Sequence, residues 1–206
     1  MNLHGSLLPH YRGRCPLNWV LLNGETRTGV TLHYMVERAD AGDIVAQRPI
    51  EIEPEDDALT LHRRIVREAE RLLAEALPSI RNGTNARTPQ QLGQGSYYGG
   101  RRPEDGIIDW DRDAAEIHNL VRAVTRPFPG ARTQLDGRTL YVWRSGPEET
   151  AGLTDPPGTI QLDSGLVVAA GHGRLRILEC QLEDGPSLVA AAFVERYGPP
   201  AGTRLV

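Results

Sequence analysis

The longest periodic stretch of the sequence, from Ala58 to Arg81, sets the strongest constraint on the fold. Apolar side chains recur there every three or four positions, with Arg and Glu between them. This pattern predicts one amphipathic α-helix that ends at Asn82-Gly83. A helix with one apolar face is stable when that face packs against another element, so the chain must provide a partner layer. The residues expected on this face are Leu61, Ile65, Ala69, Leu72, Leu73, Ala76 and Leu77.

Short apolar segments in front of this helix provide that layer. Residues 29–35 and 44–52 have the composition of β-strands, and residues 1–3 resemble the end of another strand. A short helix is expected from Pro16 to about residue 22, because proline suits the first helical turn and Gly24 ends the apolar run. Strands that alternate with helices predict an α/β fold with a parallel sheet.

The second half of the chain has a different pattern. Residues 87–105 show no periodicity and contain Gly, Gln, Ser and Arg, which indicates a linker. A helix over 113–125 is followed by short β segments, which predict a small barrel or sandwich. We therefore expect a first domain at 1–86, the linker at 87–105 and a second domain at 106–206. The expected strands are 131–135, 138–144, 158–163, 166–171 and 174–182.

Composition excludes several classes of function. All 23 basic residues are Arg, so lysine Schiff bases and P-loop lysines are excluded. Residues 104–206 carry 15 acidic residues against 10 Arg, which disfavours a nucleic-acid partner. Cys15 and Cys180 lie far apart without metal-ligand spacing, so we expect neither a disulfide nor a metal site. The sequence has no apolar run of membrane-spanning length and no signal-peptide pattern at its start. We therefore expect a cytoplasmic protein without membrane insertion.

Candidate catalytic residues lie at the expected strand ends. Asn2 and His4 are two positions apart, so on a strand their side chains point to the same face. Asp40 belongs to a second loop between strands, where open α/β sheets bind their ligands. An amide, an imidazole and a carboxylate suit acyl transfer, because they can stabilise an oxyanion and carry a proton. An Asn-x-His pair alone is a weak signal, since most such residues satisfy local hydrogen bonds. No role is assigned to His10, His33, His62, His118 or His172.

The order of residues around these candidates resembles a known family, the 10-formyltetrahydrofolate-dependent formyltransferases. The similar runs are Asn2-Leu3-His4-Gly5-Ser6-Leu7-Leu8-Pro9, Tyr11-Arg12-Gly13-Arg14-Cys15-Pro16, Gly29-Val30-Thr31-Leu32-His33 and Arg38-Ala39-Asp40-Ala41-Gly42-Asp43. The likeness is greatest to the branch that formylates UDP-4-amino-4-deoxy-L-arabinose, which occurs as a domain of a bifunctional polymyxin-resistance protein. It rests on residues 16–21, 23–26, 118–124 and 127–131.

This resemblance implies a fold, a reaction and residue roles. The fold would be the C-terminal half of a Rossmann-like sheet followed by an OB-like barrel. The co-substrate would be 10-formyltetrahydrofolate, without a metal, and the acceptor the amine of a nucleotide-linked sugar used in lipid A or cell-envelope modification. Asn2 would stabilise the oxyanion, His4 would carry the proton, and Asp40 would favour the imidazolium. The resemblance assigns folate contacts to Arg14, Val36, Glu37, Arg38, Ala39 and Asp40.

The position of the motif in the chain is a departure from the family. The catalytic domain of the family begins well before its Asn-x-His motif, so we expect the first half of the sheet to be absent here. An exposed sheet edge would follow, and the chain alone should have little or no activity. Two other functions stay open: methionyl-tRNA formyltransferase, which the acidic second half disfavours, and a non-catalytic folate- or nucleotide-binding module. A homo-oligomer is compatible with the sequence.

Overall fold

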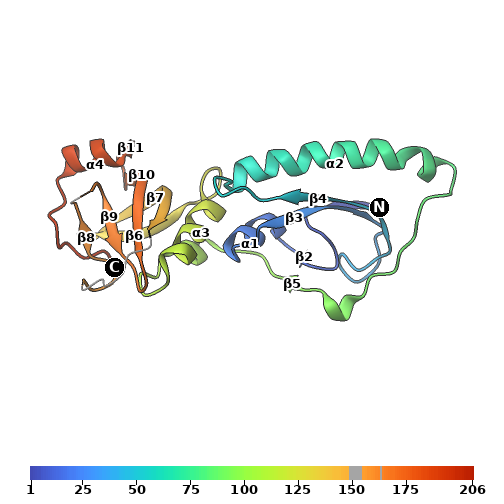
Figure 1. The fold of residues 1–206 in the computed structure, drawn as a ribbon, viewed down its shortest axis with the longest axis horizontal. Helices are drawn as coiled ribbons and strands as arrows, with labels where there is room; N and C mark the ends of the chain where they lie inside the picture. Colours follow the sequence, from blue (N-terminus) through green and yellow to red (C-terminus); the bar gives the residue numbers. More distant parts are fainter. Residues whose placement is uncertain (149–154, 163) are drawn as a thin grey trace. The chain divides into compact units, whose positions relative to one another are not determined.

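A computed structural model of the chain describes residues 1–148, 155–162 and 164–206 (Figure 1). These residues form two compact units, Met1–Arg101 and Arg102–Val206. The described part of the chain has no helix that is both long and apolar enough to cross a membrane.

The first unit contains a three-stranded sheet of β1 (Asn2–His4), β3 (Arg27–His33) and β4 (Ile44–Glu51), in the order β1-β3-β4. Both strand pairs are antiparallel, so the α/β class is confirmed but the expected parallel pairing is wrong for these strands. Residues 34–43 join β3 to β4, and this connection is shorter than the dozen or so residues that a parallel crossover needs.

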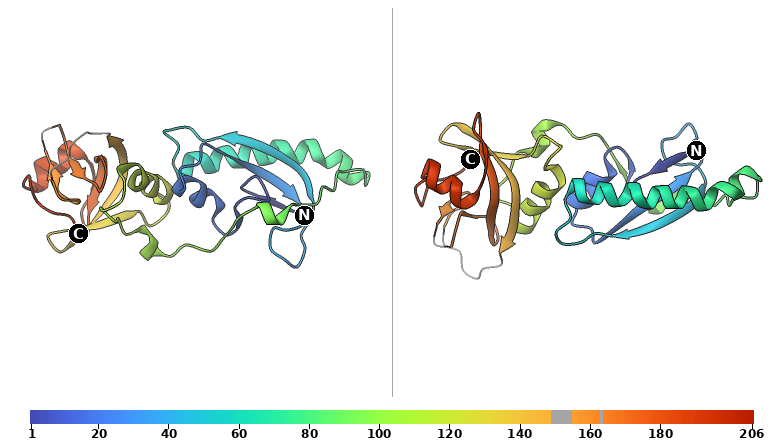
Figure 2. Two further views of the ribbon diagram at one scale, coloured as in Figure 1. Left: turned by 60° about the horizontal axis from the view of Figure 1, so that its bottom comes forward. Right: turned by 90° about the horizontal axis from the view of Figure 1, so that it is seen from above.

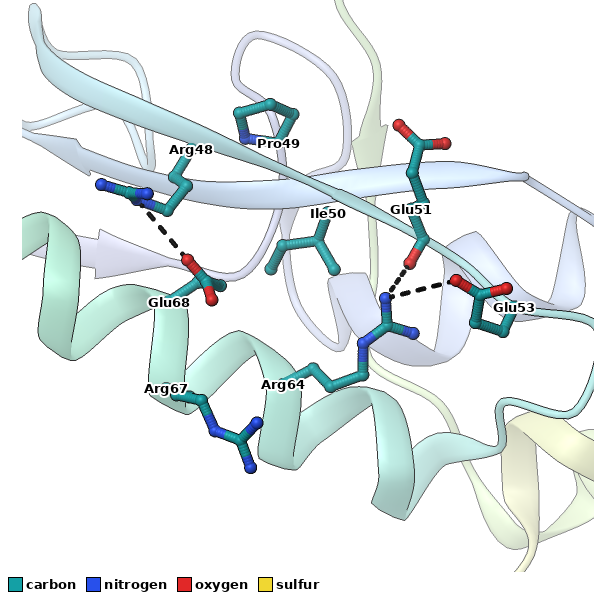
Figure 3. A pocket seen from close by; sticks show the side chains of 8 residues that line it. All are labelled: Arg48, Pro49, Ile50, Glu51, Glu53, Arg64, Arg67 and Glu68. Carbon is teal, nitrogen blue, oxygen red and sulfur yellow. Dashed lines mark hydrogen bonds and ion pairs between the residues drawn. The ribbon is translucent and has the colours of Figure 1, made fainter.

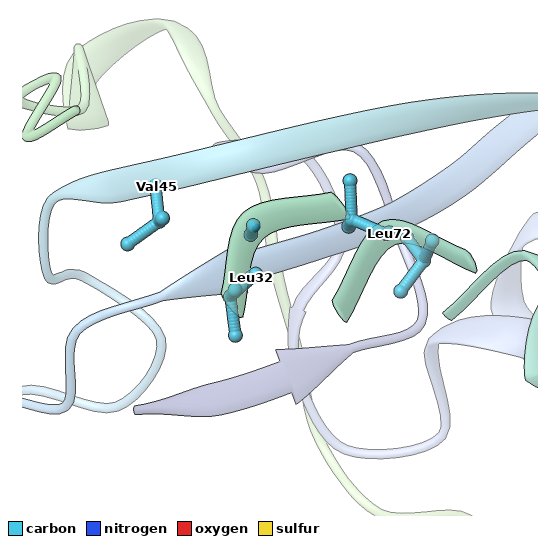
Figure 4. Close-up of a cluster of buried hydrophobic side chains, with 5 residues drawn as sticks. Leu32, Val45 and Leu72 are labelled. Carbon is cyan, nitrogen blue, oxygen red and sulfur yellow. The ribbon is translucent and has the colours of Figure 1, made fainter. Parts of the chain in front are cut away.

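The expected long helix is α2 (Ala58–Arg81), which runs along one face of this sheet (Figures 1 and 2). Asp57 caps its start, accepting hydrogen bonds from the main-chain N–H groups of Leu59 and Thr60. Leu73 and Leu77 are 38% and 47% exposed, so their predicted place on the buried face is wrong. The core under the helix is formed by Val30, Leu32, Val45, Leu72 and Ala76 (Figure 4).

Two short elements complete the part of the first unit that positions the site. Helix α1 (Pro16–Leu22) has Cys15 at its start, in the left-handed region with φ 54°. Strand β2 (Arg12–Gly13) pairs in parallel with β5 (Tyr97–Tyr98). The segment expected to be a linker thus contains β5, the 3-10 helix η1 (Leu92–Gln94) and a second one, η2 (Pro103–Gly106).

The second unit is a sheet with two helices, α3 (Ala114–Val124) and α4 (Ala190–Tyr197). Among the described residues its antiparallel pairs follow the open path β6-β7-β10-β9-β8, and β11 also pairs with β10. The OB-like closure of this sheet stays a prediction. Residue 163, in the expected strand 158–163, lies outside the described residues. The strands are β6 (Ala131–Leu135), β7 (Arg138–Glu148), β8 (Ile160–Gln161), β9 (Val167–Ala169), β10 (Arg174–Leu182) and β11 (Ser187–Val189).

The two cysteines have different surroundings. Cys15 is exposed, whereas Cys180 is fully buried in β10. Burial raises the pKa of the Cys180 thiol to about 12, because the thiolate loses its hydration.

The packing of α2 leads to a stability prediction. Replacing Leu72 with Ala should lower the free energy of unfolding by about 2–5 kcal/mol, because it leaves a cavity in the core. Replacing the half-exposed neighbour Leu73 with Ala is the matched control and should cost about 1 kcal/mol at most. Urea unfolding of both variants measures the difference. Equal losses would mean that α2 does not pack on the sheet through Leu72.

Candidate active site

The structure brings His4 and Asp40 together. His4 ends β1 and is 6% exposed, and Asp40 lies in the loop after β3. Nδ1 of His4 is 3.6 Å from Oδ2 of Asp40, with only 14% of the Asp40 side chain exposed. This is an ion-pair distance in surroundings that screen charge poorly.

The second nitrogen of His4 defines how the ring is held. Nε2 of His4 is 2.8 Å from the main-chain oxygen of Tyr11. A carbonyl oxygen can only accept, so Nε2 carries a proton and Nδ1 faces the carboxylate. An imidazolium would satisfy both partners at once. The ring is therefore held between the Tyr11 oxygen and the Asp40 carboxylate, and its part in proton transfer stays a prediction.

Asn2 reaches the site through a different residue. It pairs directly with His33 across β1 and β3, and its Nδ2 is 3.3 Å from Nε2 of His33. Nδ1 of His33 faces the main-chain oxygen of Tyr34 at 2.8 Å, so Nε2 is free to accept from the Asn2 amide. Among the described residues, no hydrogen bond joins the Asn2 side chain directly to His4 or Asp40.

His33 is the residue that sequence reasoning missed. It is 1% exposed, and its Nε2 is also 3.6 Å from Oδ1 of Asp40. The two imidazoles thus flank one carboxylate, one at each oxygen. The available signal was its place at the end of the strand before the Asp40 loop.

The Asp40 loop has an unusual main-chain shape. Asp40 adopts φ 52°, a left-handed conformation that is uncommon for a residue other than glycine. The main-chain N–H of Gly13 donates to Oδ2 of Asp40 at 2.9 Å. A side chain at Gly42 would lie 2.0 Å from the oxygen of Tyr34, so the loop needs glycine there.

The predicted folate-binding residues other than Asp40 are exposed. Arg14 follows Gly13 directly, and its side chain is exposed. Val36, 54% exposed, lies in an exposed stretch that runs from Met35 to Ala39 and leads into Asp40. Their contact with folate stays a prediction.

Tyr11 connects the site to a cluster of aromatic side chains. Its ring stacks on Tyr98 with 4.9 Å between ring centres, and its hydroxyl donates to Oε1 of Glu25 at 2.6 Å. Burial raises the pKa of the Tyr11 phenol, and the hydrogen bond to Glu25 raises it further, because ionisation would place two negative charges side by side.

A separate cavity of about 520 Å³ lies between β4 and α2, away from the site (Figure 3). Arg48 pairs with Glu68 at 3.6 Å, and Arg64 donates to the main-chain oxygen of Glu51 and pairs with Glu53 (Figure 3). The charges around this cavity largely compensate one another, so it is a weaker candidate for ligand binding. In the described ranges, no group of three or more His, Cys, Asp or Glu residues is placed so that it could hold a metal ion.

Two family models match the sequence. The model described as formyl transferase matches residues 1–77, and the model described as formyl transferase, C-terminal domain matches residues 101–198. Together they account for most of the chain, and for both of its compact units.

Several solved structures share the fold. HypX from Aquifex aeolicus, in complex with tetrahydrofolic acid, is 24% identical with a TM-score of 0.69, over 93% of this chain and 34% of HypX. An N-formyltransferase from Helicobacter canadensis, in complex with folinic acid and dTDP-3-aminofucose, is 22% identical with a TM-score of 0.70, over 85% of this chain and 65% of that one. WlaRD, a sugar 3N-formyl transferase, is 22% identical with a TM-score of 0.70, over 90% of this chain and 65% of that one. The chain therefore spans about a third of HypX and slightly less than two thirds of the two others.

The Tyr11–Glu25 pair leads to a prediction of pH dependence. The folded state holds the phenol proton more tightly than the unfolded state. This difference adds to the free energy of unfolding below the ordinary pKa of tyrosine. The added stability is lost as the pH rises through the pKa that Tyr11 has in the folded protein. Replacing Glu25 with Gln should lower the pKa of Tyr11 toward its ordinary value. The variant should then lose less of its free energy of unfolding at alkaline pH than the parent does. An NMR titration of the tyrosine rings above about pH 10 measures the shift, with Tyr11→Phe to assign the signal. An unchanged Tyr11 titration in the Gln variant would contradict the assignment.

Proposed function

Because the chain belongs to the formyl transferase family, we propose that its site transfers a formyl group from 10-formyltetrahydrofolate to the amino group of a nucleotide-linked amino sugar. The observation that carries this proposal is the buried pair of His4 and Asp40, to which the Asn2 amide is linked through His33. An amide, an imidazole and a carboxylate placed in this way suit acyl transfer, which supports the proposal.

The reaction forms one bond and breaks another at the formyl carbon. The acceptor nitrogen attacks this carbon, and its oxygen becomes an oxyanion that the Asn2 amide can stabilise by donating a hydrogen bond. His4 takes up the proton released by the amine and returns it to the folate nitrogen as the bond from that nitrogen to the formyl carbon breaks. The Asp40 carboxylate, beside the ring, would stabilise the His4 imidazolium that forms during this transfer. The residues present supply each of these functions without a metal ion.

For the acceptor we propose a UDP-linked amino sugar of the 4-amino-4-deoxy-L-arabinose type, used in lipid A or cell-envelope modification. The support is the sequence likeness in residues 16–21 and 118–131, together with two structural neighbours named as sugar N-formyltransferases or bound to an amino sugar nucleotide. Folate contacts by Arg14 and residues 36–40 belong to the same proposal. Cytoplasmic location, homo-oligomerisation and the functional division at residues 87–105 stay predictions.

Two other functions are less well supported. Methionyl-tRNA formyltransferase has the same chemistry, but the excess of acidic residues after position 103 opposes binding of a polyanion. Steeply salt-dependent binding of tRNA would favour it. A non-catalytic folate- or nucleotide-binding module would have no need of the buried imidazole–carboxylate pair.

The central test is formyl transfer to UDP-4-amino-4-deoxy-L-arabinose with His4 replaced by Ala. We expect the variant to lose about 10²–10⁴-fold in rate, because the proton carrier is removed. His10→Ala is the matched control, since the His10 side chain is exposed, and it should keep the parent rate. Product formation is followed by mass spectrometry.

The assay has two arms, because the chain spans only about two thirds of the sugar formyltransferases it resembles. One arm uses the chain alone, and the other uses the chain joined behind the amino-terminal part of such a relative. Transfer that depends on His4 in either arm supports the proposal. A folded protein that binds tetrahydrofolate and transfers nothing in both arms would point to the binding module.

A further inference from the structure

We propose that residues 88–98 form a strap that sets the spacing between the two loops of the site, and that Gln90 is the positioning residue for Asp40. From the sequence alone, these residues are expected to belong to a linker without a role. The inference rests on the proposed function for its kinetic consequences, but its structural part can be tested without any activity.

The first attachment of the strap is to the Asp40 loop. Nε2 of Gln90 donates to the main-chain oxygens of Asp40 at 2.9 Å and Gly42 at 2.7 Å. Thr88 and Ile44 exchange two main-chain hydrogen bonds, at 2.8 and 2.9 Å, which fix the strap beside the start of β4. A loop with a left-handed Asp40 depends on such outside contacts, because its own conformation is unfavourable. Gln90 therefore determines where the Asp40 main chain lies.

The second attachment is to residues 9–14. The main-chain N–H of Tyr11 donates to Oγ of Ser96 at 2.8 Å, and the N–H of Arg12 to the main-chain oxygen of Ser96 at 3.1 Å. The N–H of Arg14 donates to the oxygen of Tyr98 at 3.0 Å, and the Tyr98 ring packs against Tyr11.

The strap approaches this loop so closely that there is no space for an additional carbon atom. A side chain at Gly95 would lie 2.1 Å from the main-chain oxygen of Pro9. A side chain at Gly13 would lie 2.2 Å from the oxygen of Tyr98. The strap and residues 9–14 are thus closely packed against each other at Gly95 and Gly13.

The two loops held by the strap supply the groups that orient the reacting side chains. The loop of residues 9–14 provides the Tyr11 oxygen for Nε2 of His4 and the Gly13 N–H for Oδ2 of Asp40. The other loop carries Asp40 itself. A shift of one loop against the other would change the 3.6 Å separation of His4 and Asp40. Gln90 influences the reaction indirectly, by holding the main chain of the Asp40 loop in place.

The kinetic test removes the two donors of Gln90 with little change in its size. Gln90→Glu places carboxylate oxygens against two carbonyl oxygens, and Gln90→Met removes the donors without adding charge. Both should lower kcat at least about tenfold, since misplaced catalytic groups are costly. Gln91→Glu and Gln91→Met are the matched controls, because the Gln91 side chain is exposed, and they should keep the parent kcat.

A double-mutant cycle separates positioning from general damage to the fold. If Gln90 acts through Asp40, either Gln90 variant should have no further effect on kcat in an Asp40→Asn background. A loss of equal size in both backgrounds would overturn the proposal, and so would a folded Gln90→Met protein with the parent kcat.

Hydrogen exchange of the Gly13 amide is the readout that needs no turnover, because this N–H donates to the Asp40 carboxylate. Both Gln90 variants should speed its exchange, while amides within β3 keep their parent rates. If the parent transfers no formyl group in either arm of the assay, the proposed function fails while this measurement still decides the strap. Unchanged exchange at Gly13 in the Gln90→Met variant would overturn it.

Discussion

The arrangement of the site depends on one largely buried carboxylate. Only 14% of the Asp40 side chain is exposed, and a carboxylate in such a place needs hydrogen-bond donors or cations around it. The Gly13 N–H donates to Oδ2, and ring nitrogens of His4 and His33 each lie 3.6 Å from one carboxylate oxygen, so the groups around Asp40 come from three different segments of the chain. The carboxylate therefore does more than assist His4. It also contacts residues of β1, of β3 and of the loop of residues 9–14, and so links these three segments.

The antiparallel register of β1 and β3 explains how the three-residue strand β1 brings two side chains to the site. Asn2 lies opposite His33, and His4 lies opposite Thr31. Alternation along the strand then places Asn2 and His4 on the same side, where they meet His33. A shift of β1 by one residue would turn Asn2 and His4 to the opposite face, away from His33, so the register is part of the chemistry.

The sequence predicts the local elements of this protein better than their connections. The ends of α2 at Ala58 and Arg81 and of β10 at Arg174 and Leu182 agree with the structure, because periodicity and capping residues are local signals. The antiparallel direction of the strands was missed. The length of the connection between two strands indicates their direction, but this length is known only when the ends of both strands are known. The roles of His33 and Gln90 were missed for a similar reason. Their partners are distant in sequence, and neither lies in a pattern that periodicity can detect.

The contrast between the two thiols has a practical consequence. Cys180 is enclosed by the second sheet and stays protonated at ordinary pH, whereas Cys15 is exposed at the start of α1, two residues from Gly13. A maleimide fluorophore added to the folded protein would thus attach at a single position beside the loop that orients His4. The molecule can report on its own ligand encounters by a change in emission, without any engineered cysteine.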